Sequence, residues 1–410
     1  MLSRRGALLL AAGALTQLSL PPATPVPRAA QAPTPGEVAA LLAARAGALR
    51  THDAAALPVG GATAGAEGSE PVARIAAVPL AALEYRTPTR AAPGPDRRPV
   101  VDAVLAVRVE GYDDHPALFS RRITLIRGAG PRGARPWRVE REEAAGGAVP
   151  LWDLGTVEAA AGTHCLVLGT AGAATAPAAL VPVADRAVAA VSAAWGTGWA
   201  GRLLLEVPAT EDGFARLLDV PPADWAGMAA VTSAAAGAPA GTPADRVLIN
   251  PEAYQRLSEL GRQVVVTHEA THVATRADTR PWTPLWLSEG VADWTAYRET
   301  GRTARQIAPE LTRDVAAGRL PTALPTAADL APGAKDIAQA YELSWLACEL
   351  IARRYGPERL VGLYRAVGAA GAGAAPERRL DLALRATLGT GLADFTALWI
   401  AETRRQLAGG

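Results

Sequence analysis

The chain has 410 residues, of which 50% are hydrophobic, and its 41 basic and 40 acidic side chains leave a formal net charge of +1. This balance argues against the basic surface needed to bind nucleic acid or an anionic membrane, and the length predicts two or three domains with packed cores. Cys165 and Cys348 are far apart in the sequence, which leaves open both a disulfide and two unpaired buried thiols.

Residues 1–32 are predicted to form an export signal. Arg4 and Arg5 give a basic start, residues 6–20 are apolar but too few to span a membrane, and small residues and prolines follow. The start from Ser3 to Leu8 resembles a twin-arginine signal. We therefore expect a mature chain outside the cytoplasm, secreted or in the cell envelope, that keeps no stable membrane span.

Residues 33–145 are predicted to form an accessory domain of the α+β class. An amphipathic helix is expected from Gly36 to about His52, and one helix packed on a curved antiparallel sheet suits the order of the elements. The runs Arg74–Leu80 and Trp137–Val139 resemble the cystatin-like cone of SnoaL-type domains. The strand-like runs lie at 72–78, 83–85, 100–112, 122–127 and 136–139.

Residues 146–184 are predicted to be a linker with short strands, and residues 185–410 a second domain. This domain is expected to begin with a helix from Asp185 to Trp199 that Asp185 caps, and to continue with a small sheet and a mostly helical half. The expected strands lie at 202–208, 227–232 and 245–250, and the later helices at 304–317, 336–355, 357–369, 380–388 and 391–407.

The pattern His-Glu-x-x-His lies in an apolar run of the second domain. On an α-helix, His268 and His272 share one face about a turn apart, so both imidazoles can bind a single zinc ion. Glu269 is too close to His268 to be a third ligand, yet it can reach a water on the metal and act as a general base. With five histidines in the chain, roughly 0.003 chance matches to this pattern are expected.

Glu289 is the expected third zinc ligand. It follows His272 by 17 residues, which is enough for the first helix to end, for a loop containing Pro281 and Pro284 to turn, and for a second helix to return antiparallel. Asp293 lies one turn further along the same face and is expected to accept the free N–H of a ligating imidazole.

The His-Glu-x-x-His helix, followed by the segment from Trp286 to Trp294 with its Leu-Ser-Glu-Gly-Val-Ala-Asp run, resembles the gluzincin metallopeptidases, most closely the bacterial peptidase MA-like family. The resemblance implies a thermolysin-like zincin domain that binds one Zn²⁺ per chain and hydrolyses peptide bonds with a zinc-bound water that Glu269 activates. It is specific from Arg246 to Trp294 and looser from Gln339 to Val367. A peptide or protein is therefore the expected substrate, and no oligomeric state is predicted.

The same resemblance implies further site residues. In gluzincins, an edge strand upstream of the zinc helix binds extended substrate by main-chain pairing, which here indicates Met228, Ala229 and Ala230. Aminopeptidase relatives carry at this place an acid that holds the free amine of the substrate, so its absence favours an endopeptidase. Tyr341 is a candidate donor to the developing oxyanion, with an ordinary buried-ring tyrosine as the alternative.

A competing hypothesis is a non-catalytic module that binds a ligand or a protein and has a structural or vestigial zinc site. Glu269 argues against it, because a purely structural zinc site needs no base.

Overall fold

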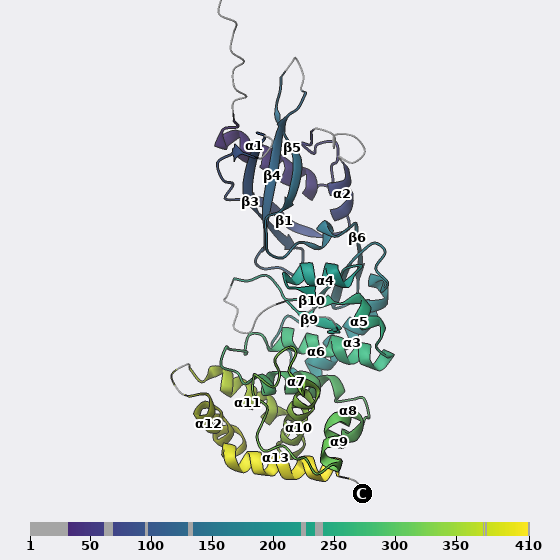
Figure 1. Cartoon of the computed structure of the whole chain (residues 1–410), viewed down its shortest axis with the longest axis vertical. Coiled ribbons are helices and arrows are strands. Elements are labelled where there is room, and N and C mark those ends of the chain that lie inside the picture. Colours follow the sequence, from purple (N-terminus) through teal and green to yellow (C-terminus); the bar gives the residue numbers. More distant parts are fainter. Residues whose placement is uncertain are drawn as a thin grey trace, which may run out of the picture.

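The computed structural model describes residues 32–60, 69–94, 97–129, 134–222, 227–233, 241–371, 373 and 375–408. These residues form three parts stacked along the long axis: an N-terminal helix-and-sheet unit, a second sheet with helices, and a C-terminal layer of helices (Figure 1). The predicted α+β class is confirmed. Apart from its last residue, the predicted export signal lies outside the described residues.

In the N-terminal unit, helix α1 (Pro35–Arg50) packs on an antiparallel sheet, as predicted. Thr34 caps α1 in a capping box with Glu37, and Pro35 occupies the first turn, where its missing N–H costs nothing. The sheet order is β1-β3-β4-β5, with β2 beside β3. Its strands are β1 (Leu80–Arg86), β2 (Ala92–Pro93), β3 (Pro99–Val109), β4 (Ala117–Arg127) and β5 (Trp137–Ala144).

One predicted strand is wrong. The sequence favours an extended segment over 72–78, but the chain there forms helix α2 (Glu70–Ile75) and a turn. Val72 and Ile75 are three residues apart and both buried, as expected for one face of a helix. Their β-branched side chains favour strands locally, and the tertiary packing outweighs that preference.

The second sheet has the order β6-β7-β8-β10-β9, with a parallel centre and antiparallel strands at both edges. Its strands are β6 (Val157–Ala161), β7 (Cys165–Thr170), β8 (Leu203–Val207), β9 (Ala230–Thr232) and β10 (Arg246–Ile249). Residues 146–184, predicted as a linker with short strands, thus supply two strands of this sheet. Cys165 on β7 and Cys348 are both buried and unpaired, which decides between the two alternatives left open for the thiols.

Helix α3 (Pro177–Trp195) begins before the predicted start at Asp185. Asp185 therefore lies inside the helix and does not cap it. Its carboxylate instead accepts hydrogen bonds from the backbone N–H groups of Thr163 and His164, at 3.0 and 2.8 Å. Of the described helices, α3 is the one whose length and apolar composition would also suit a membrane span. Its inner face belongs to the main hydrophobic core, against the sheet and α6, as expected for a core helix.

The remaining helices cover the sheet and build the C-terminal layer, with α6 against the sheet and α7 and α10 beyond it (Figure 1). The predicted helix over 304–317 is two short helices, because Pro309 has no N–H with which to continue the first. These helices are α4 (Glu211–Leu218), α5 (Pro251–Gln255), α6 (Glu259–Thr275), α7 (Leu285–Tyr297), α8 (Ala304–Ile307), α9 (Pro309–Ala316), α10 (Ile337–Tyr355), α11 (Pro357–Ala369), α12 (Pro376–Leu388) and α13 (Leu392–Leu407).

The N-terminal unit and the second sheet share a hydrophobic cluster. Leu105 of β3, Leu168 of β7 and Phe214 of α4 all belong to it. Beside it, the fully buried carboxylate of Asp113 accepts two hydrogen bonds from the guanidinium of Arg246, both at 2.7 Å. A chain without the N-terminal unit would expose this cluster and leave the Arg246 guanidinium without this partner, so the two units form one continuous structure.

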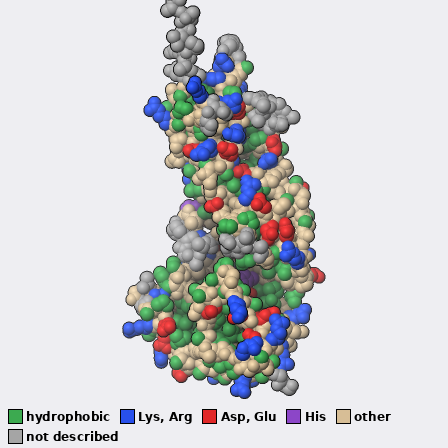
Figure 2. Space-filling view, viewed as in Figure 1, with side chains coloured by type: hydrophobic (Ala, Val, Ile, Leu, Met, Phe, Trp, Pro, Cys, Tyr) green, Lys and Arg blue, Asp and Glu red, His purple; other side chains and the backbone are tan. Residues whose placement is uncertain are grey.

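The visible surface carries basic and acidic side chains interspersed along the whole molecule (Figure 2). This mixture agrees with the nearly balanced count of basic and acidic residues.

Candidate metal centre

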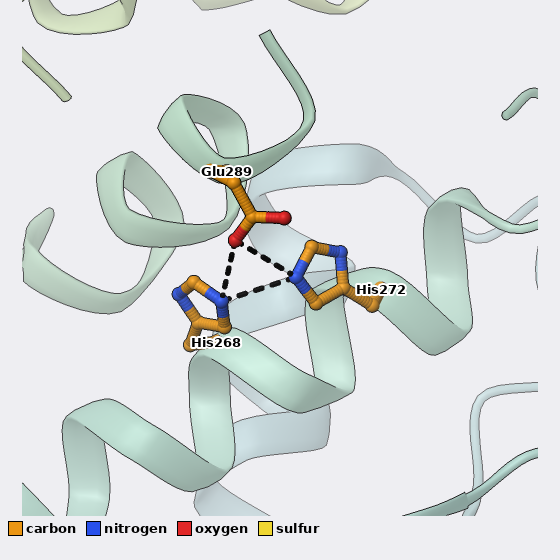
Figure 3. A group of neighbouring side chains, drawn as sticks. All are labelled: His268, His272 and Glu289. Atoms are coloured by element: carbon orange, nitrogen blue, oxygen red, sulfur yellow. Dashed lines mark hydrogen bonds and ion pairs between the residues drawn. The ribbon is translucent and has the colours of Figure 1, made fainter. Parts of the chain in front are cut away.

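Helix α6 carries the two histidines of the predicted zinc site. Ser258 caps it by accepting a hydrogen bond from the backbone N–H of Gly261 at 3.1 Å. Val266 and Ala270 are fully buried on its inner face. This burial leaves His268 and His272 on the face directed toward α7, from which Glu289 approaches (Figure 3).

The three side chains converge on one point. The Nε2 atoms of His268 and His272 are 3.0 Å apart, and Oε2 of Glu289 lies 3.2 and 3.5 Å from them. Four ligands in a tetrahedron at about 2.0–2.1 Å from a zinc ion are roughly 3.3–3.4 Å from one another. The spacing and the nitrogen and oxygen donors therefore fit zinc, and among the described residues this is the one such group of His, Cys, Asp or Glu. Their role as metal ligands stays a prediction.

Helix α7 runs back along α6, as the two prolines between the motifs predicted. Glu289 is close to both histidines, whereas Asp293, one turn later, reaches Nδ1 of the earlier histidine, His268, at 2.8 Å. A carboxylate at this nitrogen orients the imidazole and leaves Nε2 for a metal.

Burial and charge act in opposite directions on this cluster. Burial lowers the pKa of His268, but the Asp293 and Glu289 carboxylates outweigh it and raise that pKa well above its ordinary value. Burial raises the pKa of Glu289, and the two histidines outweigh it and hold that pKa well below the usual range. Glu289 is therefore ionised at neutral pH, the form in which a carboxylate binds a metal.

Replacing Asp293 with Asn is expected to weaken zinc binding by about 10–100-fold, because a neutral amide orients the His268 ring less strongly than a carboxylate. The affinity would be measured by competition with a chromogenic chelator. Glu299→Gln, at an exposed acid just beyond α7, is the matched control and should bind zinc like the wild type. Equal affinities for all three proteins would contradict the orienting role.

Glu269, the predicted general base, is buried beside the histidines at 8% exposure. Its Oε2 accepts a hydrogen bond from the Thr232 hydroxyl at 2.7 Å, which holds the carboxylate toward β9. No sequence pattern indicates Thr232. A threonine at the end of a three-residue strand has no local signature, and the contact exists because α6 packs against β9.

Tyr341, on α10, lies beside the metal centre. The centroids of its ring and the His268 ring are 6.4 Å apart. Burial raises the pKa of Tyr341, and the carboxylates of Glu289, Asp293 and Glu269 raise it further. The hydroxyl is therefore protonated at neutral pH and available as a hydrogen-bond donor.

The predicted substrate strand lies at the edge of the second sheet. Ala230 is paired with Ile249, and the carbonyl of Ala229 accepts a hydrogen bond from the N–H of Asn250 at 3.0 Å, while Met228 is 36% exposed. β9 is the last strand in the sheet order among the described residues, so its second side is paired with no described strand. This geometry suits main-chain pairing with an extended peptide, and the substrate role stays a prediction.

Gly290 allows α7 and α10 to touch. A Cβ at this position would collide with the backbone oxygen of Ser344 and lie 2.7 Å from Sγ of Cys348. This contact packs α7, which carries Glu289, against α10, which carries Tyr341.

Gly290→Ala is expected to destabilise the protein by about 1–3 kcal/mol or more, because the backbone of Ser344 must shift to admit the methyl group. Urea unfolding would measure the loss. Gly362→Ala in α11 is the control, since its Cβ would meet nothing within 4 Å and alanine favours a helix. A Gly290 variant as stable as the Gly362 variant would show that the helices separate without cost.

No protein-family model matches the sequence, and no curated protein matches it. Among solved structures, a variant of an M1 zinc metallopeptidase from Deinococcus radiodurans is 14% identical, and the match covers 77% of this chain and 59% of that chain with a TM-score of 0.36. The M1 zinc metallopeptidase from the same organism is 14% identical over 74% of this chain and 89% of its own, with a TM-score of 0.36. A variant bound to a Tyr-Ser-Ala substrate is 13% identical, and the match covers 74% of this chain and 90% of that chain with a TM-score of 0.36. At these identities and TM-scores the likeness assigns no function, so a function for this chain has to rest on the geometry of the metal centre.

Proposed function

We propose that the protein is a zinc-dependent peptidase. The observation that carries the proposal is the convergence of His268, His272 and Glu289 at tetrahedral spacing, with the carboxylate of Glu269 held beside them by Thr232. A site with a structural role needs the ligands and not the base, so the presence of Glu269 favours hydrolysis.

Each residue of the site has a role in this reaction. When bound, zinc would lower the pKa of a water molecule and polarise the substrate carbonyl. Glu269 takes a proton from the attacking water and passes it to the leaving nitrogen. The Tyr341 hydroxyl donates to the carbonyl oxygen as negative charge develops there. Asp293 keeps Nε2 of His268 directed toward the ligand cluster.

We propose that cleavage is internal rather than at the amino terminus. The strand at the edge supplies Met228, Ala229 and Ala230 and no carboxylate for the free amine of a substrate. The test is to digest a broad pool of unfolded proteins with the zinc-loaded mature protein and to sequence the new termini. Internal cuts would support an endopeptidase. Release of single amino-terminal residues would instead identify an aminopeptidase.

We also propose that the protein is exported, on the basis of the basic and apolar residues at 1–32. Expression of the full chain in a bacterial host should yield a shortened protein in the extracytoplasmic fraction, with its new amino terminus near residue 32. An unshortened protein that stays in the cytoplasm would contradict export.

A further inference from the structure

Helix α9 begins without a cap of its own. Its N-cap residue, Ala308, has no side chain that can accept a hydrogen bond, and Pro309 occupies the first turn. The first N–H groups of an α-helix have no acceptor within the helix, and burying a donor without an acceptor is costly. Leu311, in this first turn, is buried at 3% exposure, so its N–H needs an acceptor from another part of the chain.

Glu342, on α10, provides that acceptor. Its Oε2 accepts a hydrogen bond from the N–H of Leu311 at 2.7 Å, and its Oε1 accepts one from the N–H of Glu310 at 3.2 Å. Glu342 itself is 8% exposed. Because a carboxyl group that spans two N–H groups of one helix has little freedom to move, this contact fixes Glu342 as much as it caps α9.

The same contact bears on the first turns of α10, which carry Tyr341. This helix also begins without a side-chain cap, because Asp336 makes none. Its first turns are held to α9 instead, at Glu342 and through Gln339, whose Nε2 donates to Oδ2 of Asp314 at 3.4 Å. Gln339 and Glu342 flank Tyr341 along the helix, so α9 holds the backbone on both sides of the tyrosine.

Tyr341 and Glu342 point in different directions from α10. Successive residues of an α-helix are about 100° apart around its axis, so Glu342 can contact α9 while the Tyr341 ring lies 6.4 Å from the His268 ring, measured between centroids. A shift of these turns would move the Tyr341 hydroxyl relative to the metal centre. A misplacement of about 1 Å can be enough to reduce catalysis by about 10²-fold.

The side chain of Glu342 is mostly neutral at pH 7. Burial and the neighbouring Glu310 side chain raise the pKa of Glu342 to about 8, although the two N–H groups act in the opposite direction. Most of the carboxyl groups are therefore protonated at pH 7. Replacing Glu342 with a neutral residue thus changes little charge near the metal centre, and a loss of activity would report a change of geometry.

We propose that Glu342 is a positioning residue for Tyr341. By binding the N–H groups at the start of α9, Glu342 fixes the first turns of α10 and keeps the tyrosine hydroxyl beside the metal centre. The consequence for catalysis rests on the proposed peptidase function, whereas the placement of the ring can be tested without it.

The placement of the ring is tested by ¹⁹F NMR of the full mature protein, labelled with 3-fluorotyrosine and without added metal. Among the seven tyrosines, the Tyr341 resonance is the one missing from a Tyr341→Phe protein. Glu342→Met keeps the length of the side chain and removes both acceptor oxygens, so the Tyr341 resonance should shift or broaden. Glu342→Gln keeps one carbonyl acceptor and should leave the resonance close to its wild-type position. An equal effect of the two substitutions would overturn the proposal.

The consequence for catalysis is tested by a double-mutant cycle on the zinc-loaded proteins with a dye-labelled pool of unfolded proteins, which gives apparent kcat and KM. Glu342→Met is expected to lower kcat by about tenfold or more with KM within about twofold, and Tyr341→Phe alone by about 10²–10³-fold. Added to Tyr341→Phe, Glu342→Met should cost less than about twofold more, because the hydroxyl that it positions is already gone. An equal loss in both backgrounds would show a general structural role and overturn the proposal.

Two further proteins complete the test. Glu358→Met, at an exposed acid in the first turn of α11, is the control and should match the wild type in both measurements. If Glu342→Met fails to fold, Glu342→Asp replaces it with the same expected results, since its carboxyl group is one methylene too short to reach both N–H groups. If the wild type cleaves nothing in the pool while the Tyr341 resonance responds as expected, the peptidase proposal fails and the positioning of the ring stands.

Discussion

Glu269→Gln is expected to reduce peptide hydrolysis by about 10²–10⁴-fold while zinc content stays at the wild-type level. The amide keeps the size of the side chain and can still accept from the Thr232 hydroxyl, but it lacks the basicity needed to take a proton. A loss of this size is far larger than a small change of geometry would cause. Turnover of a pool of unfolded proteins by the zinc-loaded proteins would measure it.

Glu259→Gln is the matched control, because Glu259 is an exposed acid in the first turn of the same helix. It should cleave at the wild-type rate. If Glu269→Gln also cleaves at that rate, Glu269 is not the base. If none of the proteins cleaves and all bind the same partner, the non-catalytic binding module replaces the peptidase.

His268→Ala and His272→Ala are each expected to abolish zinc binding, whereas the wild type should retain about one zinc per chain. Each substitution removes one of the three proposed ligands, and we expect the remaining pair to hold zinc too weakly to survive dialysis. Elemental analysis of the dialysed proteins would give the stoichiometry. Stoichiometric zinc in both variants would place the metal elsewhere in the chain.

Thermal unfolding gives a second readout of the same site. A ligand present at about 1,000 times its Kd stabilises the folded state by about 4 kcal/mol, so a strong chelator should lower the Tm of the wild type. The two histidine variants should show no such shift. His164→Ala, at an exposed histidine in the bend between β6 and β7, should behave like the wild type in both measurements.

The sequence was sufficient for the features that depend on neighbours along the chain. The placing of His268 and His272 on one face follows from the period of the helix, and the helix expected from Gly36 follows from the spacing of its apolar residues. Predicting that Glu289 and Asp293 lie beside the histidines needed one further step. The two prolines had to be interpreted as a turn that brings the second helix back along the first. Local periodicity and turn chemistry act over a few residues, so they are visible without a structure.

Contacts between distant parts of the chain required the three-dimensional arrangement. The hydroxyl of Thr232 meets Glu269 because β9 and α6 pack together, and Gly290 meets Ser344 because two helices touch. The strand predicted around Val72 is a helix, since burial against the unit outweighs the local preference of β-branched residues. Residues 146–184 also join the second sheet through contacts with distant segments. These contacts are hydrogen bonds between strands and a shared hydrophobic core, and no local sequence pattern shows which distant segments will form them.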